Sequence, residues 1–236
     1  MSSQPIQKLQ SKQFVLLLIY TLTITLSAVV VIHGQELRQG VSVQMARTAN
    51  AVAYPAADNN DAWIVAINAD GRLFFGTKPV TPDQLFDEMK ATPRQRDARL
   101  YIKADARSKF SSLLSALREA RSVEFEQFVL LTSQHTSAAP GKMVSPEGIA
   151  VQINPHAKGR IDVRLSSQGR QSTLTVDGKP VSWAELGNTL KNQQHGPDQV
   201  VLIDAADSIP FDEVIRAMDE ARKVGATPGV LVLNSI

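Results

Sequence analysis

The side chains that most often do chemistry in proteins are sparse in this chain and follow no recognisable catalytic pattern. There is no cysteine, which excludes disulfides, thiol catalysis and cysteine-ligated metals. The four histidines have neither metal-ligand spacing nor acidic neighbours: they are His33, His135, His156 and His195. Glycine-rich phosphate loops and serine nucleophile motifs are also missing. We therefore expect no enzyme, no metal site and no bound cofactor.

The charge balance excludes another class of protein. The chain of 236 residues has 25 basic and 23 acidic side chains, which gives a formal net charge of +2. Nucleic-acid-binding domains are usually strongly basic, with lysine and arginine gathered on one face. We therefore expect no nucleic-acid partner.

One apolar stretch, residues 14–32, carries no charge and is long enough to cross a membrane. As a helix its roughly 19 residues would span about 28 Å. A cleaved signal peptide is the alternative, but the stretch is long and Val31–Gly34 is a poor cleavage site. Lys8 and Lys12 precede it, and the positive-inside rule then places a tail of residues 1–13 in the cytoplasm. The sequence predicts an uncleaved single-pass anchor.

The predicted membrane helix contains hydroxyl side chains but no carboxylate. Thr21 and Thr25 share one helical face, and Thr23 and Ser27 share another. Hydroxyl groups can bond to a neighbouring helix inside a bilayer, whereas proton carriers in membranes are usually acids or histidines. These four residues are therefore candidates for helix packing and not for proton transfer.

Beyond the anchor, the sequence repeats itself at an offset of about 101 residues. Residues 73–85 correspond to residues 174–186, and each segment contains a helix-starting capping pattern, at Thr81 and at Ser182. A period near 100 residues suits a duplicated domain. The apolar helical stripe of Phe110, Leu113, Leu114 and Leu117 returns as Phe211, Val214, Ile215 and Met218.

Each copy has the order β-β-α-β-α-β, which predicts an α+β fold with one sheet per copy and both helices on one face. The expected domains are residues 62–132 and 160–236, preceded by linkers at 33–61 and 133–159. Residues 149–153, inside the second linker, alternate apolar and polar types and indicate an additional edge strand.

Three residues are candidates for contact with a partner. Asp105 and Asp207 each follow a predicted strand and precede a helix. The ordinary role of such an aspartate is to cap the helix, and the alternative is recognition of a partner. Trp183 falls in the first turn of a predicted helix, where its ring either joins the core or forms a docking surface.

The anchor and the repeated element order together resemble the ExbD/TolR family, over about three quarters of the chain. The second copy matches at Lys179, Pro180, Val181, Leu186, Ile203, Asp207, Pro210, Phe211, Val214, Met218, Asp219, Ala221 and Gly225. The first copy matches at Ile67, Asp70, Gly71, Lys78, Pro79, Val80, Leu85, Ile102, Ala104, Asp105, Phe110 and Ala120 but lacks the closing glycine.

The resemblance implies a homodimeric protein of the bacterial inner membrane, with its C-terminal domains in the periplasm. Its helix would join an ExbB/TolQ-like protein, and its domains would bind a TonB/TolA-like protein or peptidoglycan. The chain departs from the family pattern by having two such domains and no aspartate in its membrane helix. The alternative is therefore a membrane-tethered scaffold without a motor role.

Overall fold

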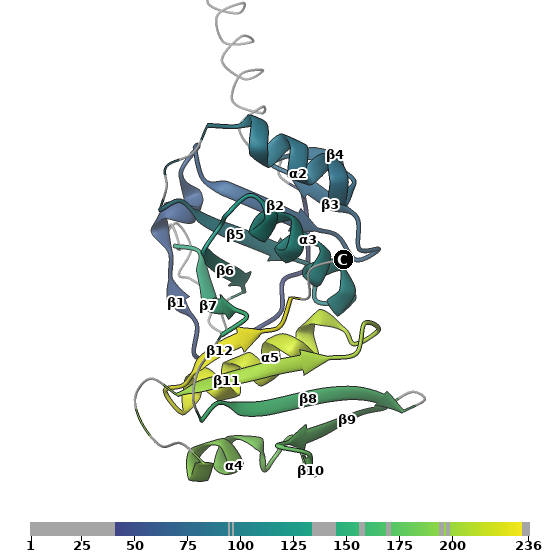
Figure 1. Ribbon diagram of the computed structural model, residues 1–236, viewed down its shortest axis with the longest axis vertical. Helices are drawn as coiled ribbons and strands as arrows, with labels where there is room; N and C mark the ends of the chain where they lie inside the picture. The colour runs from purple at the N-terminus through teal and green to yellow at the C-terminus, as the bar shows by residue number, and fades with distance from the viewer. Residues whose placement is uncertain are drawn as a thin grey trace, which may run out of the picture. The chain divides into compact units, whose positions relative to one another are not determined.

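The computed structural model describes residues 41–93, 95, 97–133, 145–155, 159–168, 171–193, 196 and 199–232 (Figure 1). Residues Val41–Ile236 form one compact unit. The expected anchor at 14–32 and all four histidines lie outside the described residues. Among the residues that are described, no helix is long and apolar enough to cross a membrane.

The two copies have the same elements in the same order. The first contains β2 (Trp63–Ile67), β3 (Leu73–Phe75), β4 (Lys78–Val80), α2 (Pro82–Ala91), β5 (Arg99–Ala104), α3 (Phe110–Ser122) and β6 (Gln127–Thr132). The second contains β8 (Ile161–Gln168), β9 (Gln171–Val176), β10 (Lys179–Pro180), α4 (Leu186–Gln193), β11 (Val200–Ala205), α5 (Phe211–Lys223) and β12 (Thr227–Val230). The Lys-Pro segments of β4 and β10 thus form short strands at the two ends of the sheet path.

The two copies share one sheet, and the element that joins them was expected to be an edge strand. β7 (Glu147–Ile153) pairs antiparallel with β6 and parallel with β12. The order is β10-β9-β8-β11-β12-β7-β6-β5-β2-β3-β4, with β1 (Val52–Ala53) also paired to β7. Without β7, the backbone groups of β6 and β12 would lack partners on one side. The edge position predicted for residues 149–153 is therefore wrong.

A glycine permits the close approach of β7 to β6. A side chain at Gly148 would place its Cβ 2.7 Å from the carbonyl oxygen of Leu130, which is backbone and cannot move aside cheaply. Gly148 is opposite Leu131 in the register of the two strands. The strand that joins the copies therefore depends on a residue without a side chain at this position.

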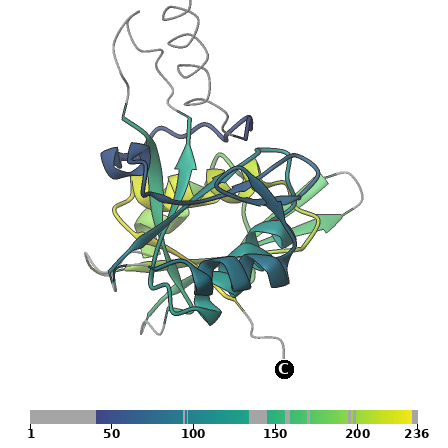
Figure 2. The same cartoon turned by 90° about the horizontal axis from the view of Figure 1, so that it is seen from above.

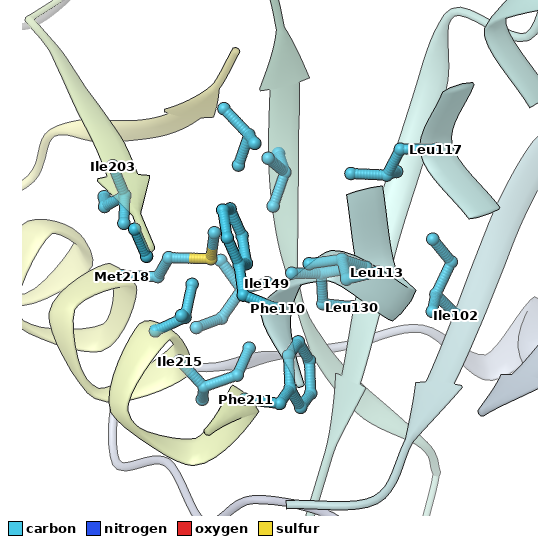
Figure 3. Packing of buried hydrophobic residues seen from close by; sticks show 14 of the residues in the cluster. Ile102, Phe110, Leu113, Leu117, Leu130, Ile149, Ile203, Phe211, Ile215 and Met218 are labelled. Carbon is cyan, nitrogen blue, oxygen red and sulfur yellow. The ribbon is translucent and has the colours of Figure 1, made fainter. Parts of the chain in front are cut away.

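The α+β class is confirmed, but the two copies do not have separate sheets or separate cores. One buried cluster includes the helices of both copies and the sheet face beneath them. Phe110, Phe211 and Ile149 lie where the two halves of this cluster meet (Figure 3). Packing is therefore continuous from the first copy through β7 into the second.

The predicted helical stripes form this core, with one exception. The stripe of the second copy is fully buried, with 0% exposure at Phe211, Val214, Ile215 and Met218. In the first copy, the exposed fraction is at most 2% at Phe110, Leu113 and Leu117. Leu114 is only half-buried and packs against the margin of the core. Leu114 is therefore less buried than Ile215, its counterpart in the second copy.

One of the two predicted capping boxes is complete. The amide of Gln84 donates to Oγ1 of Thr81 at 3.3 Å, and the amide of Thr81 donates to Oε1 of Gln84 at 2.9 Å. At Ser182 only the reverse bond forms, from its amide to Glu185 Oε2 at 3.1 Å. Helix α4 accordingly begins at Leu186, three residues later than the equivalent point in the first copy.

The chain before β2, expected to be a linker, covers the other face of the first copy's strands. Residues of β1, the short helix η1 (Pro55–Asp58) and the adjoining turns lie across those strands from α2 (Figure 2). Tyr101, Val129 and Leu131 are buried there together with Ala57. On the equivalent face of the second copy, Arg164 and Asp204 form an exposed salt bridge of 2.9 Å.

Candidate functional site

The loops that precede α3 and α5 bond to one another in a reciprocal pattern. The amide of Phe110 donates to the carbonyl of Ile209 at 2.9 Å, and that of Phe211 donates to Ser108 at 2.8 Å. One residue further on, the amide of Ser111 donates to the carbonyl of Asp207, and that of Asp212 donates to Ala106. The first amides of a helix have no partner within it. Each copy therefore caps the corresponding helix of the other.

Asp105 lies where the incoming chain crosses the end of β5. Its side chain is 4% exposed and accepts bonds from Nε of Arg107 at 2.9 Å and from the amide of Gln44 at 3.0 Å. The Arg107 side chain, against an opposing effect of burial, holds the pKa of Asp105 well below its usual value, and the Gln44 and Arg107 amides lower it further. Its carboxylate is engaged within the chain and does not cap α3.

Asp207 occupies a different position from Asp105, although the sequence paired the two. The amide of Asp105 bonds to Ile67 in β2, and its structural equivalent is Ala206, whose amide bonds to Leu165 in β8. Asp207 is exposed, and its carbonyl accepts the Ser111 amide from the other copy. It does not cap α5 with its side chain, because Pro210 precedes that helix without a side-chain cap. A partner-contact role for Asp207 stays a prediction.

A second carboxylate, which sequence reasoning missed, fastens the same incoming chain to the second copy. Asp219 in α5 accepts bonds from the amides of Ala49 at 3.1 Å and Asn50 at 2.8 Å. The Asn50 side chain also donates to it at 3.1 Å. Asp219 belongs to the family-like pattern, but the separation of 169 residues leaves no local signal of this contact.

Trp183 lies in the turn before α4 and not in its first turn, because the helix begins later than expected. The guanidinium of Arg216 lies over its ring, 4.4 Å from the centroid. The ring is half-buried and packs against the main core. Its remaining surface faces a cavity of about 660 Å³ between α4 and α5.

The candidate helix-packing residues Thr21, Thr23, Thr25 and Ser27 lie outside the described residues. Within the described ranges, no group of three histidine or acidic side chains is placed to hold a metal ion.

Comparison with known proteins agrees with the repeat seen in the structure. The family model described as Biopolymer transport protein ExbD/TolR matches twice, over residues 13–135 and 127–233. The first match includes the predicted anchor, and each match contains one copy of the β-β-α-β-α-β unit. No curated protein matches the chain. The chain belongs to the ExbD/TolR family.

Proposed function

We propose that this protein is an inner-membrane component of an energy-coupled envelope transport complex and acts by binding partners, without catalysis. The observation that carries the proposal is the double family match, whose first part begins at residue 13 and so includes the predicted membrane helix. The described residues add two copies that share one sheet and are both bonded to the chain segment that precedes β2, at Gln44 and Asn50.

The partners that we propose follow the family. The helix would assemble with an ExbB/TolQ-like membrane protein, and the two domains would lie in the periplasm and bind a TonB/TolA-like protein or peptidoglycan. Because residues 14–32 contain no acid, a proton that drives the complex would have to be carried by another subunit. The hydroxyl groups of the predicted helix are then available for packing against the ExbB/TolQ-like protein; they belong to Thr21, Thr25, Thr23 and Ser27.

The reciprocal contact between the copies bears on the expected homodimer. Pairs of helix ends that cap one another are a two-fold arrangement, and here both partners come from one chain. A homodimer of this protein would need a further surface. One chain also supplies two domains for one predicted membrane helix.

A membrane-tethered scaffold without a motor role is the second candidate. The absence of a carboxylate in the predicted membrane helix favours it. In that case the two copies would bind peptidoglycan or protein, and the helix would only hold them at the membrane. The two candidates differ in whether an ExbB/TolQ-like ring protein is bound.

Co-purification separates the two candidates. The full-length, tagged chain is expressed together with the ExbB/TolQ-like protein of the same organism, extracted in mild detergent and isolated through the tag. We expect the ring protein to be retained in a fixed ratio, and the intact N-terminus to be found by mass spectrometry. Recovery without the ring protein, together with sedimentation on purified peptidoglycan, would support the scaffold. A soluble product that starts near Gly34 would refute the anchor.

A further inference from the structure

The helix pairs α2/α3 and α4/α5 are copies of one unit, but their grooves differ at one position. Leu85 and Met89 on α2 are buried, as are their equivalents Leu186 and Leu190 on α4. With this alignment of the two copies, Gly187 is the second copy's equivalent of Phe86. Both residues are half-buried and face the neighbouring helix.

In the first copy, Phe86 lies in the groove between its two helices. It lines that groove with Ser122, the last residue of α3, and with Val123, which follows it. The ammonium group of Lys90 lies over its ring, 5.5 Å from the centroid. The copy thus supplies its own aromatic side chain and a cation to cover it.

In the second copy the cation is kept and the aromatic side chain is missing. Lys191 is the equivalent of Lys90, and it lines the cavity of about 660 Å³ together with Trp183 and Gly187. The volume lies within the range of about 300–1,000 Å³ that is typical of ligand pockets. The cavity beside Phe86 in the first copy measures about 460 Å³, so the groove that lacks the aromatic ring is the larger of the two.

The charged residues around the groove also differ between the two copies. At positions that line the second cavity, Ala184, Asn188 and Lys223 stand where the first copy has Asp83, Asp87 and Ser122. Glu124, which lines the first cavity, is replaced by Gly225. In the first copy, burial and secondly the carboxylate of Asp83 raise the pKa of Glu119. The second copy loses these three acids and gains a lysine. Its groove favours an acidic ligand.

One acid remains in the second groove and lies where the aromatic ring would enter. Glu220 is paired with Lys223 at 3.2 Å, and a Cβ built on Gly187 would meet its Oε2 at 2.5 Å. The end of a glutamate side chain turns away at little cost, because several rotamers are open to it. An acidic ligand would compete with Glu220 for Lys223 and would open the floor of the groove.

We propose that the α4/α5 groove binds an acidic segment of a partner protein, which inserts an aromatic side chain against Gly187 beneath Lys191. The inserted ring takes the place that Phe86 has in the first copy, and the acidic side chains of the segment face Lys191 and Lys223. This inference rests on the proposed function, for which it gives the chemistry of a periplasmic partner. It also assigns different tasks to the copies, because Phe86 already occupies the ring position in the first groove.

The probe is a fluorescein-labelled, amidated peptide of sequence Glu-Glu-Phe-Glu-Glu, titrated against the full-length chain in detergent and followed by fluorescence anisotropy. We expect Gly187→Phe and Lys191→Glu each to weaken binding about tenfold, as loss of a ring site with its cation–π contact implies. Replacing the peptide's phenylalanine by alanine should weaken binding to a similar extent. Lys90→Glu, the matched change in the first copy, should leave binding unchanged.

Thermal unfolding of each variant shows whether a loss of peptide binding is caused merely by a loss of folding. Gly187→Phe replaces a helical glycine, so its unfolding temperature should not fall. Equal weakening by Lys90→Glu, or undiminished binding to Gly187→Phe, would overturn the proposal. So would displacement of the peptide by chitotriose, because a sugar would then be the occupant. Co-purification with the ring protein should be unaffected by Gly187→Phe, which separates failure of this inference from failure of the proposed function.

Discussion

Phe110 and Phe211 begin equivalent helices, and each donates its amide to the loop that precedes the other, at 2.9 and 2.8 Å. The two rings lie close to β7 in the shared core (Figure 3). A pair of domains that merely followed one another on a chain would not need such a relationship. The duplication has therefore produced a two-fold pair inside one polypeptide, with the sheet and the helix ends joined together.

A disulfide between the copies tests this pairing. Lys109 and Pro210 face one another between the two bonds just described, which is the non-hydrogen-bonded position of an antiparallel pair. Cα atoms at such positions are about 4.5 Å apart, within the range that a disulfide requires. Lys109→Cys/Pro210→Cys in this cysteine-free chain should form an intramolecular disulfide on mild oxidation. Electrophoresis without reductant, with both single variants as controls, would detect it. Only chain-to-chain disulfides would contradict the internal pairing.

The two helical stripes should respond unequally to truncation. Ile215→Ala should lower the free energy of unfolding by about 2–5 kcal/mol, because it leaves a cavity at a fully buried site. Leu114→Ala should cost about 1 kcal/mol, since Leu114 is half-buried and its surroundings can relax. Denaturant unfolding followed by tryptophan fluorescence measures both. Equal losses would mean that Leu114 is more deeply packed than its exposure indicates.

Asp105→Asn should destabilise the protein in a pH-dependent manner. At pH 7 the expected loss is about 1–3 kcal/mol, because the Arg107 and Gln44 bonds lose their charged acceptor. The folded-state pKa of Asp105 is lowered, so its contribution is complete above its unfolded pKa and is lost as the pH falls through the folded value. The difference between native chain and variant should therefore narrow below about pH 4. The exposed Asp207→Asn is the matched control. A constant difference down to pH 2 would exclude this origin.

The hydroxyl pairs of the predicted membrane helix should matter for assembly. Thr21→Val/Thr25→Val or Thr23→Val/Ser27→Val should reduce co-purification with a ring protein, because each contact between membrane helices is worth about 0.6–2 kcal/mol. Membrane insertion should be unchanged, as measured by carbonate extraction. Intact assembly combined with loss of proton-dependent activity would instead place these hydroxyls in the ion path.

The sequence by itself determined the local elements and the duplication. Period-two and helical patterns and the capping residues act within a few residues of one another, so they can be read without the fold. The recurrence of the Phe110 stripe at Phe211 in the same way required no structure. The family resemblance followed from this order of elements, and the family comparison agrees with it.

The tertiary structure alone decided how the copies are joined. The sequence indicated the strand at residues 149–153 but not its central position in the sheet. Its pairing with both β6 and β12 depends on which strand edges are free, and no local pattern records that. The roles of Asp105 and Asp219 likewise depend on backbone amides 61 and 169 residues away. The open groove at Gly187 becomes visible only when α4 is packed against α5, because a missing side chain has a meaning only where a neighbour would have met it.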